Sequence, residues 1–340
     1  MQTFRAGLLL WAALACLGAE SLPAALARYE FKRLEMAMEF RLVLHAADQT
    51  TAERAADAAF QRIQQLNDIM SDYDPDSELS KLSHSSGQGQ AVHVSDDLWF
   101  VLERAQALAE RSGGAFDVTV GPYVNLWRRA RRQHKLPDPA RLARAGEAVG
   151  YKHVRLDPER HTVELLAPNM RLDLGGIAKG YAVDQALKAL REQGIRQALI
   201  EAGGDMGVSE PPPGKTGWRI ELSSVDDTNA PPARFLLLKN CAISTSGDLY
   251  QRLEINGKRY SHIVDPHTGI GLTDHSVVNV IAPQGIISDS LTKVVAVLGP
   301  KKGLEFIERT PGVVARTMRD IGGRIEVSES RGFAQYYERN

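Results

Sequence analysis

A strand that passes through two glycines into a helix most strongly limits what this chain can fold into. Arg171 to Leu174 alternates as a strand, Gly175-Gly176 breaks the pattern, and Ile177 to Gln193 recurs at helical spacing before a closing glycine. Gln197 to Glu201 is typical of a further strand. Strand, helix and strand in this order predict a mixed α/β unit in which helices pack on a sheet.

The flanking segments extend the same pattern. Phe31 to Ala46 suits a strand, and Thr50 with Glu53 forms a capping box that predicts the start of a helix. Later in the chain the pattern is strand-rich up to Pro283, and a helix is expected from Asp289.

Length and composition indicate one globular unit. The 340 residues carry a net charge of −1 and are 43% hydrophobic, which suffices for one large domain or two interlocked lobes. Without repeats or clean linkers, residues 28–340 are expected to form a single domain with two lobes that share a cleft. The neutral balance gives no reason to expect nucleic acid as a partner. Basic residues cluster on one segment, which we interpret as a solvated helix face: Arg128, Arg129, Arg131, Arg132 and Lys135.

The first 27 residues are typical of an export signal. Arg5 precedes the apolar run Gly7 to Gly18, and small-x-small sites follow. Twelve residues are too few to span a bilayer, so the mature protein is expected to be exported and periplasmic, without a membrane-spanning segment. Cys16 is either a lipidation site or an apolar signal residue. With the signal removed, Cys241 is the one remaining cysteine.

The glycine turn has a chemical consequence of its own. It places backbone N–H groups and the positive end of a helix at one point, where phosphate groups bind readily. Lys179, one turn into the helix, adds a positive charge. The alternative is a turn with no ligand, because this motif is neither a Walker A loop nor GxGxxG.

Four further residues carry candidate chemistry. His262 and Asp265 offer a base and a carboxylate on one bent loop, or else a surface histidine beside an Asx-type turn. Asp289 offers an oxygen ligand for Mg²⁺, or else a helix cap. Tyr73 can stack on a flat ring, or else pack against the protein.

Taken together, these segments resemble the ApbE family of FAD:protein FMN transferases from about Met36 to Gly303. The resembling stretches occur in the family's order and spacing: SDYDPDSELSKL, GGAFDVTVGPYVNLW, LDLGGIAKGYAVDQA, EAGGDMG, ISTSGDLYQ, GKRYSHIVDPHTG and SDSL…AVLG. The resemblance implies a mixed α/β fold with two lobes around an FAD cleft.

The resemblance also implies site residues. His262 corresponds to a proposed base, with Asp265 beside it, and Gly176 and Asp289 correspond to metal ligands. The remaining positions correspond to cofactor contacts: Met36, Tyr73, Ala115, Phe116, Asp117, Asp173, Lys179 and, by substitution, Lys293.

Three positions depart from the family's pattern. The Met-Gly-Thr motif is Met36-Ala37-Met38, and Ser83 replaces an asparagine. The family's second metal-binding side chain is a threonine four residues after the aspartate, where this chain has Lys293. A charged lysine cannot ligate Mg²⁺, so two hypotheses remain: a metal at Asp289, or an ammonium that pairs with Asp289 and takes the metal's place.

The function implied by the resemblance is transfer of FMN from FAD to a threonine or serine of an exported or membrane acceptor protein, with release of AMP. Two alternatives stay open, namely an FAD-binding protein without activity and a hydrolase that splits FAD into FMN and AMP.

Overall fold

The computed structural model describes residues 25–222, 234–247 and 252–339. The predicted export signal, with Cys16, therefore lies outside the described residues except for its last three, and so does the end of the ISTSGDLYQ stretch. In the described part of the chain, no helix combines the length and apolarity that a bilayer crossing requires. The structure confirms the predicted mixed α/β fold.

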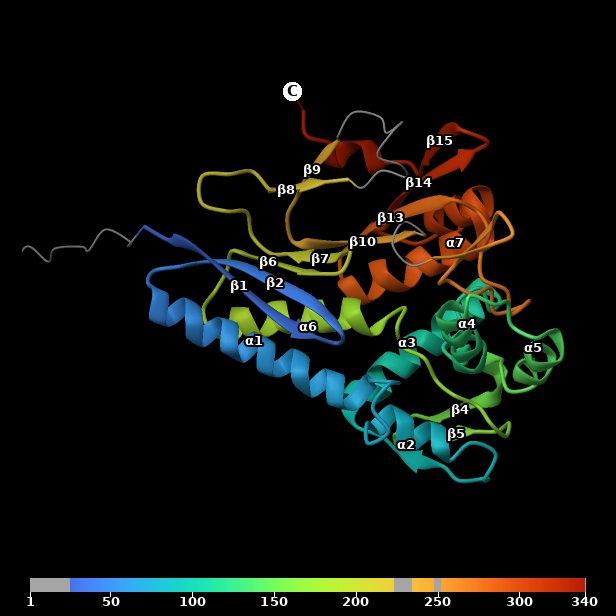
Figure 1. Cartoon of the computed structure of the whole chain (residues 1–340). Coiled ribbons are helices and arrows are strands. Elements are labelled where there is room, and N and C mark those ends of the chain that lie inside the picture. The colour runs from blue at the N-terminus through green and yellow to red at the C-terminus, as the bar shows by residue number, and fades with distance from the viewer. Residues whose placement is uncertain (1–24, 223–233, 248–251, 340) are drawn as a thin grey trace, which may run out of the picture.

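An eight-stranded sheet organises the larger part of the molecule (Figure 1). Its order is β1-β2-β6-β7-β10-β13-β14-β15, and every neighbouring pair is antiparallel. The strands are β1 (Ala27–Glu35), β2 (Met38–Ala46), β6 (Ala198–Ala202), β7 (Asp205–Val208), β10 (Cys241–Gly247), β13 (Ser276–Ala282), β14 (Val314–Ile321) and β15 (Arg324–Glu329).

The single strand predicted over Phe31 to Ala46 is in fact a hairpin. Met36 and Ala37 form the turn between β1 and β2, both with positive φ (48° and 61°). Two successive positive φ angles are the geometry of a tight hairpin turn, which usually contains Gly, Asn or Asp. Neither residue is of that kind, so no turn could be predicted at this point from residue type.

Three long helices cover one face of the sheet: α1 (Gln49–Met70), α6 (Ala178–Glu192) and α7 (Gly285–Glu308). The alternation of side chains along β2 explains both faces. Phe40, Leu42 and Leu44 are fully buried in the cluster under these helices. Val43 points the other way, into a second cluster beneath the hairpin of β8 (Trp218–Glu221) and β9 (Phe235–Leu238).

Two of these helices begin earlier than the sequence indicated. Asp48 caps α1 by accepting the N–H of Thr51 at 2.7 Å, so Thr50 is not the cap. The helix expected from Asp289 starts at Gly285. Its first N–H groups, at 285 and 286, donate to the carboxylate of Asp184 in α6 at 2.6 and 2.9 Å. A cap supplied by another helix leaves no local signal in the sequence.

The remaining elements form a smaller part beside the sheet (Figure 1). Helices α2 (Glu78–His84), α3 (Asp96–Ser112), α4 (Gly121–Gln133) and α5 (Pro139–Gly146) surround a three-stranded sheet ordered β3-β5-β4. These strands are β3 (Val92–His93), β4 (Val154–Asp157) and β5 (Thr162–Leu165). Two other short elements are η1 (Tyr151–His153) and the hairpin of β11 (Arg252–Ile255) and β12 (Lys258–Ser261). The last, η2 (Phe333–Tyr336), instead belongs to the larger part, where it contacts β9 and β14.

Helices α6 and α7 touch backbone to backbone at their first turns. A Cβ atom on Gly180 would lie 2.1 Å from the carbonyl oxygen of Gly285, and one on Gly285 would lie 2.5 Å from that of Gly180. Only glycine at both positions allows this approach. The same contact brings the N–H of Gly180 to 3.1 Å from the carboxylate of Asp289.

Gly180→Ala should destabilise the protein by about 1–3 kcal/mol, because the added methyl group forces α6 and α7 apart. Helix propensity alone predicts the opposite sign, a gain of about 1 kcal/mol for alanine. Urea unfolding measures the difference. Lys188→Ala, at an exposed position of the same helix, is the control. Unchanged or increased stability of the Gly180 variant would show that the contact is not tight.

Candidate active site

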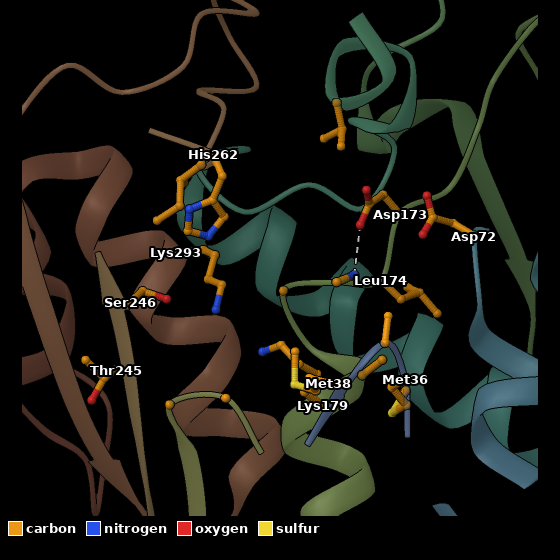
Figure 2. Close-up of a pocket in the computed structure, with 18 of the residues that line it drawn as sticks. Met36, Met38, Asp72, Asp173, Leu174, Lys179, Thr245, Ser246, His262 and Lys293 are labelled. Atoms are coloured by element: carbon orange, nitrogen blue, oxygen red, sulfur yellow. Dashed lines mark hydrogen bonds between the residues drawn. The ribbon is translucent and has the colours of Figure 1, made fainter. Parts of the chain in front are cut away.

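A cavity of about 1150 Å³ lies between the large sheet with its helices and the smaller part of the molecule (Figure 2). Its lining comes from the β1–β2 turn, the α1–α2 loop, the start of α6, strand β10, the loop after β12 and helix α7. Ten of the residues predicted from the sequence line it: Met36, Tyr73, Ala115, Phe116, Asp117, Asp173, Gly176, Lys179, His262 and Lys293.

The glycine turn before α6 lies on the cavity wall, and its backbone is largely engaged internally. Asp173 accepts the N–H of Gly175 at 2.8 Å (Figure 2), and the N–H groups of residues 177 and 178 both donate to Leu174. With the N–H of Gly180 bonded to Asp289, most amides that the sequence offered for phosphate are taken. Anion binding at this turn therefore depends mainly on nearby side-chain charges.

The loop at residues 115–117 is held against the glycine turn. The N–H of Asp173 donates to Val118 at 2.8 Å, which joins the two segments. Both carboxylate oxygens of Asp117 accept bonds, from the N–H and hydroxyl of Thr119 and from the N–H of Tyr151. Burial raises the pKa of Asp117. Its carboxylate thus fixes the loop that presents Ala115 and Phe116 to the cavity.

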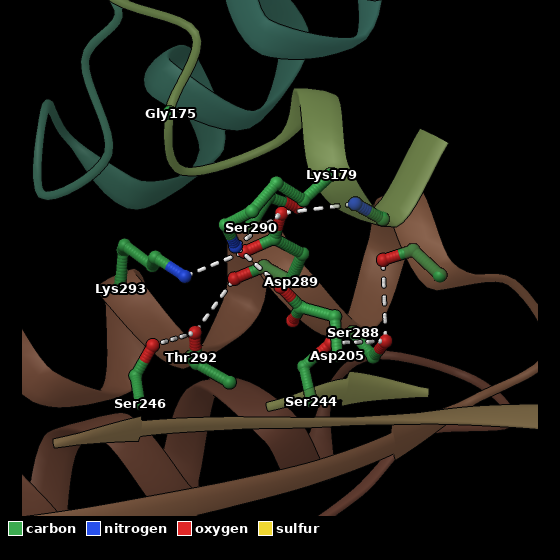
Figure 3. A network of polar contacts seen from close by, with 12 residues as sticks. Gly175, Lys179, Asp205, Ser244, Ser246, Ser288, Asp289, Ser290, Thr292 and Lys293 are labelled. Carbon is green, nitrogen blue, oxygen red and sulfur yellow. Dashed lines mark hydrogen bonds and ion pairs between the residues drawn. The ribbon is translucent and has the colours of Figure 1, made fainter. Parts of the chain in front are cut away.

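Four charged side chains form a connected chain at the floor of the cavity (Figure 3). Lys293 donates to Asp289 at 2.5 Å, and Lys179 donates to Asp205. The Lys179 ammonium also lies 3.7 Å from the second oxygen of Asp289, which accepts the N–H of Gly180. Asp289 is fully buried, whereas both lysines reach the cavity. The predicted contact between Lys293 and Asp289 is present.

The two lysines and two aspartates determine one another's ionisation. Burial opposes the charged form of Asp289, but the charges of Lys179 and Lys293 outweigh it and lower its pKa. Burial likewise disfavours the charge of Lys179, yet Asp205 and Asp289 outweigh it and raise its pKa. Burial and the charge of Asp289 raise the pKa of Asp205. The floor is thus a pair of cations held by buried carboxylates.

Hydroxyl groups join this floor to strand β10. The hydroxyls of Ser246 and Thr292 lie 2.8 Å apart, as do those of Ser244 and Ser288. Thr292 also donates to the main-chain oxygen of Asp289 at 2.6 Å. This seam fixes the rotation of α7, and hence the direction in which Asp289 and Lys293 point.

The predicted metal ligands, Gly176 and Asp289, do not fit Mg²⁺ as they stand. Mg²⁺ requires six oxygen ligands near 2.1 Å. One oxygen of Asp289 is bonded to the Lys293 ammonium, and the other faces the N–H of Gly180 and Lys179. The carbon chain of Lys293 passes Gly176, where an added Cβ would lie 3.3 Å from its Cγ. Among the described residues no group of three or more acidic, histidine or cysteine side chains is placed to hold a metal.

His262 and Asp265 are placed differently from each other. His262 lines the cavity above Lys293 (Figure 2). Asp265 is not part of the lining, and its oxygens accept the N–H of His267 at 2.9 Å and the hydroxyl of Thr268 at 3.1 Å. Trp127 anchors the same turn through the carbonyl of residue 269. This geometry supports the Asx-turn alternative for Asp265, which shapes the loop.

Arg128 joins three residues that line the cavity on the side away from the two lysines: Asp72, Asp173 and Tyr73. Its guanidinium bonds Asp72, lies 3.1 Å from Asp173, and sits 4.3 Å above the ring of Tyr73. Burial and the charge of Asp72 raise the pKa of Asp173. Tyr73 is 71% exposed, so its ring covers the arginine on one side and faces outward on the other.

The interpretation of the basic cluster as a solvated helix face is therefore wrong for two members. Arg128 and Arg131 line the cavity, whereas Arg129 and Arg132 are exposed. A signal was present, because Val124, Arg128 and Arg131 recur at helical spacing and mark one face of α4. Sequence reasoning missed it because the carboxylates that face Arg128 come from distant segments.

Two departures from the expected pattern also have structural counterparts. Ala37 adopts φ 61°, a left-handed conformation that glycine adopts without strain. The hydroxyl of Ser83 accepts the N–H of Leu172 at 3.1 Å and so ties α2 to the segment that ends in Asp173.

The chain matches known proteins over most of its length. A family model described as the ApbE family matches residues 36–317. An FAD:protein FMN transferase of Haemophilus influenzae is 32% identical over 286 residues, covering 82% of this chain and 83% of that protein. The protein of the same description from Treponema pallidum is 32% identical over 300 residues, again with 82% and 83% covered.

Solved structures give the same result. The apo form of the flavinyl transferase ApbE from Pseudomonas stutzeri superposes with a TM-score of 0.81 at 25% identity, covering 93% of this chain and 99% of that one. The flavin transferase ApbE from Vibrio cholerae also gives a TM-score of 0.81, at 27% identity, with 92% and 99% covered.

Arg128→Ala should destabilise the protein by about 2–3 kcal/mol, because it removes the guanidinium that pairs with the largely buried carboxylates of Asp72 and Asp173. Arg132→Ala, on the exposed face of the same helix, should change stability by less than about 0.5 kcal/mol. Urea unfolding of both variants measures the contrast. Equal effects would restore the view of this cluster as a solvated face.

Proposed function

This chain belongs to the ApbE family and is an FAD:protein FMN transferase, and from that premise we propose how its own residues carry out the transfer. FAD is the substrate. We propose that a threonine or serine hydroxyl of an acceptor protein attacks the phosphorus of the FMN half, and that AMP leaves.

The observation that carries the proposal is the convergence of two lysines and a histidine on one cavity. Lys179 and Lys293 present ammonium groups at its floor, and His262 lies above Lys293 (Figure 2). A volume of about 1150 Å³ exceeds that of most small-ligand pockets and suits a dinucleotide. The two cations favour the diphosphate, because charge-assisted bonds to phosphate oxygens are the strong ones.

Other residues that line the cavity support a proposed orientation of FAD. We propose that the diphosphate lies near Gly176, where the start of α6 adds a favourable dipole. Phe116 and Tyr73 both line the cavity and offer aromatic surfaces for the ring systems, Tyr73 with its ring against Arg128. Met36, at the β1–β2 turn, is an apolar contact on the same cavity.

His262 is the proposed general base. It takes the proton of the acceptor hydroxyl as the new oxygen–phosphorus bond forms and the diphosphate bridge breaks. AMP departs with the bridging oxygen, so that a diphosphate diester and an alcohol become a phosphate diester, AMP and one proton. Asp265 holds the loop that carries His262, through its bonds to His267 and Thr268.

We further propose that transfer takes place outside the cytoplasm. The support is the N-terminal basic residue followed by the apolar run Gly7 to Gly18. An acceptor protein in the same compartment is the partner, and Cys16 is a candidate for lipid attachment.

Incubating the full chain with FAD and an acceptor protein bearing a flavinylation motif tests the activity. We expect covalently attached FMN, detected by mass spectrometry, together with one AMP per FMN transferred. Free FMN with AMP identifies a hydrolase instead. FAD that stays bound and unchanged identifies a binding protein, and failure to bind FAD in calorimetry contradicts the whole assignment.

His262→Ala should retain FAD affinity but slow transfer about 10²–10⁴-fold, because general-base catalysis typically contributes that much. His84→Ala, at an exposed position of α2, is the matched control and should transfer normally. Stopped assays of covalent FMN against time measure the rates. A His262 variant that transfers at the normal rate would remove the imidazole from the mechanism.

A further inference from the structure

We propose that the Lys293 ammonium, held by Asp289, is the resident cation of this transferase. It contacts the FAD diphosphate during transfer, and the reaction therefore proceeds without a divalent metal ion. This inference rests on the proposed function and concerns the same cavity.

The position of Lys293 is the first support. Its ammonium lies 2.5 Å from one oxygen of Asp289, its side chain is 17% exposed, and it lines the cavity. The carbon chain packs along Gly176, where even one added methyl group would meet it. Lys293 thus fills the space between the two groups that would otherwise ligate a metal.

The local charge is the second support. Lys179 and Lys293 carry two positive charges, and Asp205 and Asp289 carry two negative ones, so this floor is neutral without a further ion (Figure 3). A divalent cation at Asp289 would stand next to two ammonium groups. Like charges at such short range repel strongly in a partly buried site, where water screens them little. A metal could bind only after Lys293 had moved away.

The chemistry needs a cation, and it need not be a metal. Phosphoryl transfer is accelerated mainly by positioning and by neutralising charge on the phosphoryl oxygens. Lysine supplies a point charge with three donor protons, which suffices for one bond to Asp289 and others to phosphate oxygens. Lys179, in the first turn of α6, supplies the second charge and is paired with Asp205.

The competing explanation is that Lys293 only neutralises Asp289. It would then contribute to folding and leave the reaction to a metal bound elsewhere. The two explanations predict different effects of EDTA on the transfer rate of the unmodified protein. This test needs no variant, so it does not depend on whether a variant folds.

The first experiment measures transfer by the unmodified protein after treatment with EDTA, with and without added Mg²⁺. We expect rates that agree within about twofold. Lys293→Thr in EDTA should be slower by about 10²–10³-fold, the usual loss when one group that stabilises a developing charge is removed. Mg²⁺ should restore part of this loss, because the variant frees one oxygen of Asp289. Lys302→Thr, exposed on the later part of α7, should match the unmodified protein throughout.

The second experiment titrates Mn²⁺, as a probe for divalent ions, into the FAD complex and follows its electron paramagnetic resonance signal. We expect no stoichiometric site in the unmodified protein and one site in Lys293→Thr. Activation of the unmodified protein by Mg²⁺ of tenfold or more, or a stoichiometric Mn²⁺ site in it, overturns the inference. If no transfer occurs under any condition, the proposed function fails, while the Mn²⁺ titration still decides whether Lys293 excludes a metal.

Discussion

The contact between the first turns of α6 and α7 is the constraint on which the rest of the site depends. Because Gly180 and Gly285 have no side chains, the two helices meet at backbone distance. Asp184 of α6 then caps α7, and the N–H of Gly180 reaches the buried Asp289. A buried carboxylate is tolerated only when it is bonded and paired, so the same contact determines where Lys179 and Lys293 must lie.

The two sides of the cavity carry different arrangements of charged side chains. At the floor, two lysines that line the cavity are held by two buried aspartates. On the far wall, Arg128 lies between Asp72 and Asp173, with its flat face covered by Tyr73. The first arrangement suits a diphosphate, and the second rigidifies the wall on which a ring system can lie. A dinucleotide with a charged centre and flat ends matches both.

Features formed by neighbouring residues could be predicted from the sequence, whereas contacts between segments far apart in the chain could not. The glycine turn and the helix after it were predicted correctly, because they follow one another directly. The strand predicted over Arg171 to Leu174 was wrong: this segment is extended chain whose one β-bridge joins Arg171 to Val120. The cap of α7 by Asp184 and the pairing of Arg128 with Asp72 join segments far apart, and no local pattern encodes them. The β1–β2 turn was missed for another reason, since Ala37 adopts a positive φ that its residue type does not signal. Gly176 and Asp289 were predicted as metal ligands from the resemblance alone. The bonds of Asp289 to Lys293 and to the N–H of Gly180 leave them unsuited to Mg²⁺ in this arrangement.

Helical register explains why a threonine beside Lys293 does not restore a metal site. Successive residues of a helix point about 100° apart, so position 293 lies about 40° to one side of Asp289 and position 292 about 60° to the other. Thr292 accordingly turns toward β10, where its hydroxyl bonds Ser246 and the main-chain oxygen of Asp289. The threonine that the resemblance implied as a metal ligand is thus present one position too early, and it does not line the cavity. At position 293 an ammonium therefore stands where the resemblance implied an oxygen ligand, and the paired carboxylates around it make that arrangement electrostatically consistent.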